Sequence, residues 1–198
     1  MSHVSDTSFQ GWMTPRPIAA QLVAEFNVVL DCAAAHHNAV VNAYFDGSEH
    51  FLDGLKAPWD VTADSSAYCN PPYENVPAWL AKAEAEVESG RCNRALLLVP
   101  FSAGVVWMTS ALVRHEVHIF DSRIKFDLPP DEYLPEDYRD GRKRRSPGGG
   151  NALVVIQQDG LRGLTAIRSS ETGEIVFDFL ELPVSRRGFF DQKAKVAS

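Results

Sequence analysis

The chain has 198 residues, of which 45% are hydrophobic and 23% are charged. This length suits a single domain over residues 1–198, and the composition excludes wholesale disorder, a collagen-like repeat and a coiled coil. The chain contains no apolar stretch long enough for a transmembrane helix, and its N-terminus lacks the pattern of a signal peptide. Its 3 cysteines include no C-x-x-C pair, so we expect no disulfide framework, no metal and a cytoplasmic location.

The net charge is −7, from 19 basic and 26 acidic residues. A protein that coats nucleic acid through bulk charge is basic. The charge therefore excludes a general nucleic-acid coat, but it allows an enzyme with a local basic patch.

Hydrophobic periodicity and turn residues predict helices that alternate with strands. In chain order, we expect a helix from its N-cap Thr14 to Phe26, a strand over 27–31, a helix over 36–45, a strand over 66–70, a helix over 76–90, a strand over 94–100, a helix over 104–116, strands over 117–120 and 151–157, and a hairpin over 163–182. The strands are continuous apolar runs, which are typical of a sheet covered on both faces. The pattern predicts an α/β fold with a mostly parallel central sheet, helices on both faces and a C-terminal β-hairpin.

Three segments depart from this pattern. We expect residues 1–11 to form a flexible N-terminus and residues 185–198 a frayed tail. Residues 127–150 begin with acidic residues and prolines and end in three glycines, which predicts a long mobile surface loop. This loop carries a basic run that either clamps DNA phosphates or lies in solvent, namely Arg142, Lys143, Arg144 and Arg145.

Two predicted strands end in polar residues, Asp31 and Asn70. Open α/β sheets bind ligands at the carboxyl ends of their strands, near a topological switch point. We therefore expect these two side chains to lie at the ligand-binding edge of the sheet.

The tetrapeptide Asn70-Pro71-Pro72-Tyr73 directly follows a predicted strand. An exocyclic aromatic amine is a poor nucleophile because its lone pair is delocalised into the ring. The Asn70 amide oxygen and the Pro71 carbonyl can accept its two N–H bonds, and two prolines stiffen the turn that aims them. Tyr73 offers a face on which a base can stack. The motif predicts methylation of a planar amine, and the alternative is a rigid turn after a strand.

Six landmarks in this order resemble the phage and prophage DNA N6-adenine methyltransferases. They are Trp12-x-Thr14-Pro15, Leu30-Asp31-x-Ala33-Ala34 with Asn38-Ala39, Asp53-Gly54-Leu55 with Trp59, Cys69 to Tyr73, Leu97-Leu98-x-Pro100, and Arg123-Ile124-x-Phe126. The resemblance implies a Rossmann-like class I methyltransferase fold, S-adenosylmethionine as the methyl donor and adenine N6 in double-stranded DNA as the acceptor. It also implies a bacterial or phage-infected cell. The cofactor-binding residues that we expect from it are Trp12, Thr14, Pro15, Asp31, Ala33, Asp53 and Asn70.

Several of these roles have alternatives. Asp31 meets the methionyl ammonium group, accepts a main-chain N–H of the next turn or caps a helix. Asp53 accepts from the adenine amino group of the cofactor or forms an ordinary Asp-Gly turn. The loop after Asp31 contains no glycine for close approach to the cofactor, unlike many such enzymes, and small residues such as Ala33 take that place. The partner of the ribose stays open between Asp46 and Glu49.

The acceptor also has alternatives, because the same two hydrogen-bond acceptors suit any planar NH₂ group. Cytosine N4, an RNA base and a glutamine amide fit, and a non-catalytic nucleic-acid-binding module that keeps the fold is a further possibility. Arg123 either meets nucleic acid or forms a structural ion pair. The sequence leaves the DNA word and the oligomeric state open.

Overall fold

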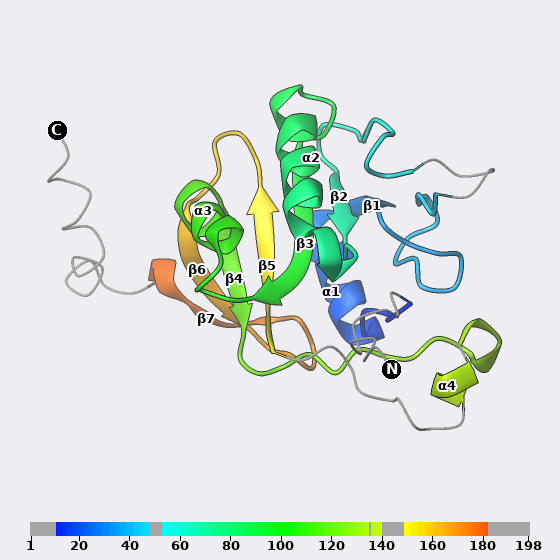
Figure 1. Ribbon diagram of the computed structural model, residues 1–198. Coiled ribbons are helices and arrows are strands. Elements are labelled where there is room, and N and C mark those ends of the chain that lie inside the picture. The colour runs from blue at the N-terminus through cyan, green and yellow to red at the C-terminus, as the bar shows by residue number, and fades with distance from the viewer. Residues whose placement is uncertain (1–10, 48–52, 135, 140–148, 182–198) are drawn as a thin grey trace, which may run out of the picture.

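The computed structural model describes residues 11–47, 53–134, 136–139 and 149–181 (Figure 1). Within these ranges no helix is both long and apolar enough to cross a membrane. The predicted flexible N-terminus, except Gly11, and the predicted frayed tail lie outside the described residues.

The described residues form one seven-stranded sheet with the order β1-β2-β3-β5-β4-β6-β7. The pairs β1–β2, β2–β3 and β4–β6 are parallel, whereas β5 is antiparallel to β3 and β4, and β7 is antiparallel to β6. The sheet is therefore mixed, although five of its seven strands point the same way. The strands are β1 (Val28–Asp31), β2 (Ser66–Cys69), β3 (Arg94–Phe101), β4 (Glu116–Phe120), β5 (Gly150–Ile156), β6 (Gly163–Arg168) and β7 (Ile175–Asp178).

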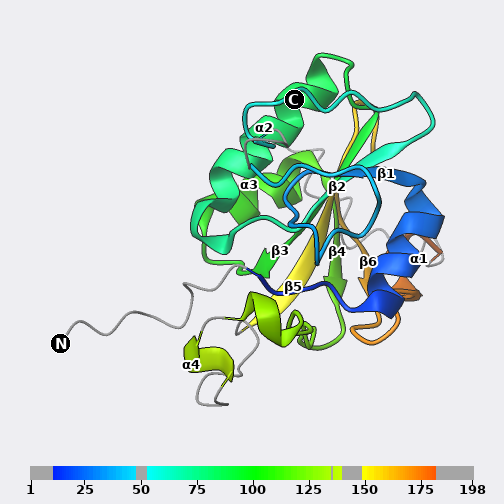
Figure 2. The same ribbon diagram turned by 90° about the vertical axis from the view of Figure 1, so that its right-hand side faces the viewer.

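Helices cover both faces of this sheet, which confirms the α/β class. Figure 2 shows α2 and α3 on one face and α1 on the other. Successive residues of the central strands alternate between two apolar clusters, so that Leu97 packs with the α2 and α3 residues and Leu96 packs with the α1 residues. The helices are α1 (Arg16–Phe26), α2 (Val76–Glu88), α3 (Val106–Arg114) and the short α4 (Glu136–Arg139), with 3-10 turns η1 (Tyr73–Asn75), η2 (Asp131–Tyr133) and η3 (Phe179–Glu181).

The predicted helix over 36–45 is wrong, because this segment forms turns and bends. The Asp31 carboxylate accepts the Val40 N–H at 3.0 Å, and the Asn38 amide oxygen accepts the Ala35 N–H at 2.5 Å. Tyr44 then pairs with Asp31 in an isolated parallel β-bridge. Side chains that bond the backbone in this way compete with helical hydrogen bonds, and here they fold the segment into a loop.

Two further expectations need correction. The N-cap of α1 is Pro15, with no side-chain cap, and Thr14 instead bonds Tyr68. Over its described part, the segment 127–150 contains η2 and α4 and buries Leu134 and Tyr138, and its mobility stays a prediction. The strand order also runs outward from β1 through β2 to β3, so no switch point lies between β1 and β2.

A buried arginine fastens α1 to β6. Arg168 is 0% exposed and donates to both carboxylate oxygens of Glu25, at 2.6 and 2.8 Å, and to the Gly173 carbonyl at 2.7 Å. Its Nε also donates to His118 Nδ1 at 2.7 Å, so the other ring nitrogen carries the hydrogen that Glu116 accepts at 2.8 Å. This network holds α1 against the sheet, and with it the residues that immediately precede the helix.

A buried carboxylate joins α2 to the segment that precedes β2. Glu86 is 1% exposed and accepts hydrogen bonds from Arg91 Nε at 2.7 Å, from Lys82 Nζ and from the Trp59 main-chain N–H at 3.1 Å. Burial alone would raise the pKa of Glu86, but these bonds from Arg91, Lys82 and Trp59 hold the pKa at about 2. Glu86 therefore stays charged and anchors the segment around Trp59.

We expect Glu86→Gln to lower the free energy of unfolding by about 3 kcal/mol, since it breaks a buried ion pair while Arg91 stays half in water. The folded-state pKa of Glu86 lies below its ordinary value of 4.5, so its stabilising effect is complete above that value. It is lost as the pH falls from there toward about 2. Urea denaturation from pH 7 to pH 3 measures both effects. Exposed Glu88→Gln on the same helix is the control, and equal stabilities of the two variants would contradict the assignment.

Candidate active site

The candidate site lies where β1 and β2 end side by side. These strands are parallel, and Asp31 is the register partner of Tyr68. Asn70-Pro71-Pro72 follows β2 and leads through η1 into α2. The prediction that Asp31 and Asn70 share one edge of the sheet is therefore confirmed.

The side-chain amide of Asn70 is oriented from outside the motif. Asn70 Nδ2 lies 3.5 Å from Thr14 Oγ, and Thr14 Oγ lies 2.8 Å from the Tyr68 hydroxyl. Thr14 and Tyr68 are both buried, and burial raises the pKa of Tyr68 well above its usual value, which keeps its phenol neutral. An amide nitrogen only donates, so the amide that faces Thr14 with its nitrogen turns its oxygen away from Thr14.

Tyr73 is held at its ring and at its hydroxyl. Its ring packs edge-on against Phe126, with 6.4 Å between the ring centroids and an interplanar angle of 77°. The hydroxyl oxygen accepts a hydrogen bond from Asn151 Nδ2 at 3.3 Å. Burial raises the pKa of Tyr73 against the opposing effect of this bond, so the phenol stays neutral. Tyr73 as a residue is only partly buried.

The Asp31 carboxylate is occupied within the protein. Asp31 is 2% exposed, and its oxygens accept the N–H of Val40 at 3.0 Å and of Ala33 at 3.4 Å. Burial raises the pKa of Asp31 to about 7, and these two N–H bonds oppose the rise. Of its three predicted roles, the structure contains the bond to the main chain of the next turn. The helix-cap role is wrong because residues 32–47, which follow β1, form turns and bends.

We call the turn Asn70-Pro71-Pro72-Tyr73 at the end of β2 the corner. A cavity of about 350 Å³ lies beside this corner and is lined by its Pro72. Its volume falls in the range typical of small-molecule sites. Small residues from the loop after β1 form one wall, and the Asp53-Gly54 turn, Pro72 and Trp79 of α2 form others. The cavity thus brings together three predicted residues, Ala33, Asp53 and Pro72, with Asp46 as a further lining residue. The other ribose candidate, Glu49, lies outside the described residues.

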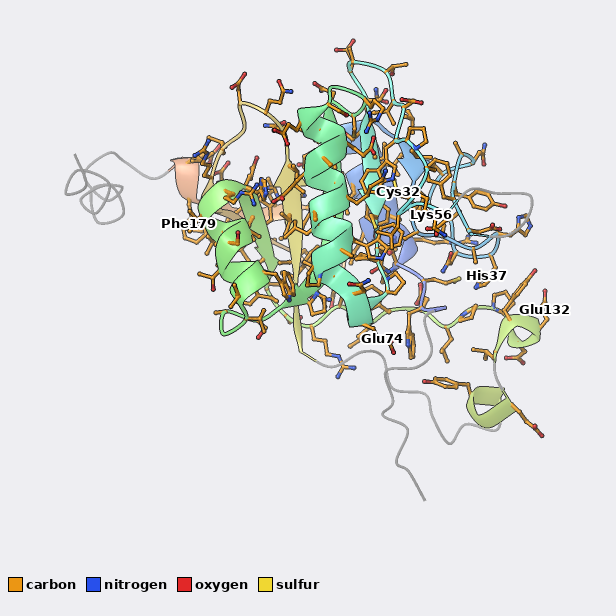
Figure 3. The ribbon with its side chains drawn as sticks, turned by 45° about the horizontal axis from the view of Figure 1, so that its top comes forward. Cys32, His37, Lys56, Glu74, Glu132 and Phe179 are labelled. Atoms are coloured by element: carbon orange, nitrogen blue, oxygen red, sulfur yellow. The ribbon has the colours of Figure 1, made fainter. Side chains whose placement is uncertain are left out.

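Gly54 approaches the loop after β1 too closely for any side chain. A Cβ atom built on Gly54 would lie 1.9 Å from the Cys32 carbonyl oxygen and 3.0 Å from the Trp79 ring. The Gly54 carbonyl accepts the Trp59 indole N–H at 2.8 Å. Figure 3 places Cys32 and Lys56 on the same side of the molecule, beside α2. A glycine at position 54 therefore lets this segment pack directly against the loop after β1.

Asp53 both forms a turn and lines the cavity. Its side chain accepts the Leu55 N–H at 3.0 Å and pairs with Lys56 Nζ at 3.0 Å. The bond with Lys56 and then the one from Leu55 lower the pKa of Asp53. The turn role is thus present, and the side chain also stands at the cavity wall.

The other predicted residues lie elsewhere. Trp12 packs edge-on against Tyr138 with 6.3 Å between ring centroids, and Met13 pairs with Asp127. Gly11 lines the cavity, but five of the predicted cofactor-binding residues do not, namely Trp12, Thr14, Pro15, Asp31 and Asn70. Arg123 is exposed, in a stretch whose alternate residues Ile124 and Phe126 are buried. Arg142, Lys143, Arg144 and Arg145 lie outside the described residues.

Sequence reasoning did not find Asn151 as a site residue. It is a buried amide at the start of β5, followed by five apolar residues. A polar residue that begins such a run was the available signal. The described residues contain no cluster of three or more histidine, cysteine or acidic residues arranged to hold a metal ion.

The fold and the site together define an α/β protein with a cavity near the carboxyl ends of two parallel strands, lined by small residues, by Pro72 of a stiff proline turn and by the Trp79 ring. Residues 1–169 match the family model described as DNA N-6-adenine-methyltransferase (Dam), so the chain belongs to this family. A search of curated proteins found no match. Membership makes the general activity methylation of adenine N6 in DNA, for which the family generally uses S-adenosylmethionine.

We expect Gly54→Ala to lower the free energy of unfolding by about 1–3 kcal/mol, because the new methyl group meets the rigid carbonyl of Cys32. Gly104→Ala is the matched control, since a Cβ there meets nothing within 4 Å, and it should change stability by no more than about 0.5 kcal/mol. Urea denaturation compares the three proteins. Wild-type stability of Gly54→Ala would show that the two segments are not in close contact.

Proposed function

We propose that this protein is a site-specific methyltransferase of the Rossmann-like class I fold that transfers a methyl group from S-adenosylmethionine to N6 of an adenine flipped out of duplex DNA. The observation that carries the proposal is the orientation of Asn70. Its amide nitrogen faces Thr14, so its amide oxygen is turned away from Thr14, and Pro72 of the same turn lines the cavity of about 350 Å³.

The residues around the cavity fit S-adenosylmethionine. Ala33, Ala34 and Gly54 contribute little side-chain volume, so a ligand can approach the backbone closely. Asp53 supplies a carboxylate that can accept from an amino group, and Trp79 supplies an aromatic ring. When bound, this cofactor supplies a methyl group on a positively charged sulfur.

Asn70 and Pro71 act on the acceptor amine. The Asn70 amide oxygen and the Pro71 carbonyl accept its two N–H bonds and hold the lone pair toward the methyl donor. Transfer of the methyl group that bound S-adenosylmethionine would supply leaves the acceptor nitrogen positively charged. The two oxygens stabilise this charge, and the acidified N–H then loses its proton without a dedicated strong base. Catalysis therefore depends on positioning and on acceptor electrostatics.

Tyr73 receives the target base in this proposal. Tyr73 is a partly buried residue. Stacking on its ring would return to a flipped base part of the few kcal/mol of stacking that the base loses when it leaves the duplex. Arg123 is an exposed residue shortly after the end of β4, and we assign it a contact with a DNA phosphate. We assign the basic run Arg142 to Arg145 the same role, in which it neutralises backbone charge that the acidic body of the protein would repel.

Incubation with labelled S-adenosylmethionine and DNA, RNA or protein tests the acceptor. We expect label in DNA alone, as N6-methyladenine, and methylome sequencing of an expressing cell then gives the DNA word. N4-methylcytosine, a labelled RNA base or a labelled glutamine would overturn the adenine assignment. A protein that labels nothing and does not bind S-adenosylhomocysteine in calorimetry would instead be a non-catalytic module.

We expect Asn70→Ala to lower kcat at least about 100-fold, because the transition state loses a preorganised acceptor. Its affinity for S-adenosylhomocysteine should stay within about threefold of wild type, because the amide acts on the acceptor. Single-turnover methylation and calorimetry measure the two quantities. Asn75→Ala is the matched control, as Asn75 is exposed and its side chain makes no cap hydrogen bond. Equal losses of rate and affinity would mean that Asn70 serves the cofactor.

We expect Thr14→Val to lower kcat about tenfold, because it keeps the shape of the side chain but removes the hydroxyl that orients Asn70. Thr14→Ser restores the hydroxyl and should recover most of the rate. Single-turnover methylation of both variants, with cofactor affinity measured in parallel, tests this. Weaker cofactor binding with an unchanged rate would return Thr14 to the cofactor-contacting role that the sequence suggested.

A further inference from the structure

Both the nitrogen and the oxygen of the Asn151 side-chain amide form hydrogen bonds within the protein. It is 4% exposed at the start of β5. Its Nδ2 donates to the Tyr73 hydroxyl oxygen at 3.3 Å, and its Oδ1 accepts the Ile124 N–H at 3.4 Å. A polar side chain at such a position lowers stability unless it is hydrogen-bonded, and the bonds here lead from the core to the catalytic corner.

The Ile124 N–H decides which way this amide faces. A main-chain N–H only donates, so the amide oxygen must face Ile124 and the amide nitrogen must face Tyr73. Tyr73 therefore accepts, and its own hydroxyl hydrogen stays available for another partner. The Tyr73 ring packs on Phe126, two residues beyond Ile124. One short stretch, 124–126, thus braces Tyr73 at the ring directly and at the hydroxyl through Asn151.

We infer that Asn151 is a positioning residue that sets the angle of the Tyr73 ring on which the flipped base stacks. This inference rests on the proposed function and adds a residue outside the N-P-P-Y motif to it. Asn151 pairs with Pro100 of β3 in the sheet register, and it does not line the cavity beside the corner. Loss of the amide therefore changes how the base is held while the cofactor pocket keeps its shape.

The experiment compares wild type with Asn151→Ala, Tyr73→Phe and the double variant. The substrate is an unmethylated duplex that contains the DNA word found by methylome sequencing. Its target position holds adenine for the rate measurement and 2-aminopurine for the fluorescence measurement. We expect Asn151→Ala to lower kcat about tenfold, the effect of one neutral hydrogen bond. Affinity for S-adenosylhomocysteine should stay within twofold, and the fluorescence change on base flipping should be altered. Exposed Asn93→Ala, at the opposite end of the sheet, is the matched control.

The double variant separates positioning from folding. If Asn151 acts through the Tyr73 hydroxyl, Tyr73→Phe reproduces the rate loss and adding Asn151→Ala lowers the rate no further. Additive losses, or a wild-type rate in Tyr73→Phe, would overturn the inference. A fall in rate that matches a fall in folded protein would reduce Asn151 to a structural residue. If Asn151→Ala does not fold, Tyr73→Phe alone is the test. A roughly tenfold lower rate supports the inference, and a wild-type rate overturns it. A wild-type protein that methylates no substrate would instead refute the proposed function, and this inference with it.

Discussion

The hydrogen bond between Thr14 and Tyr68 is the contact on which the candidate site depends. Tyr68 is buried in β2, the strand that ends just before Asn70, and Thr14 immediately precedes Pro15, the N-cap of α1. Because Thr14 also meets the Asn70 amide, the N-terminal segment controls the orientation of a side chain 56 positions away in the chain. The Arg168–Glu25 pair holds α1 in place, so an ion pair at the other end of the helix supports this geometry.

The cavity wall depends on a second chain of contacts. Glu86 on α2 accepts the Trp59 main-chain N–H, and the Trp59 indole donates to the Gly54 carbonyl. Gly54 then lies against the Cys32 carbonyl in the loop after β1. A buried carboxylate whose charge two cations stabilise thus fixes the distance between the two segments that border the cavity. The landmark Asp53-Gly54-Leu55 with Trp59 serves this structure whatever the cavity binds.

Tyr73 and Asn70 are two ends of one motif, yet they are oriented by unrelated parts of the molecule. Asn70 is oriented by Thr14 on the α1 side, and Tyr73 by Asn151 and Phe126 at the other side of the corner. The stiff Pro71-Pro72 pair between them limits how far either side chain can move independently. A site that is braced at both ends suits a reaction in which positioning provides most of the rate.

The sequence by itself determined the strands, the helices α1, α2 and α3, and the position of Asn70 after β2. Continuous apolar runs bury both faces of a strand wherever they lie, and Pro-Pro stiffens a turn in any context. The same local periodicity failed over 36–45, because Asp31 and the pairing of Tyr44 with β1 are contacts that no local pattern contains. Only the tertiary structure decided that Thr14 meets Asn70, that Gly54 packs against the loop after β1, and that Asn151 reaches Tyr73. These contacts join residues far apart in the chain, and their geometry exists only after the sheet and its helices have packed.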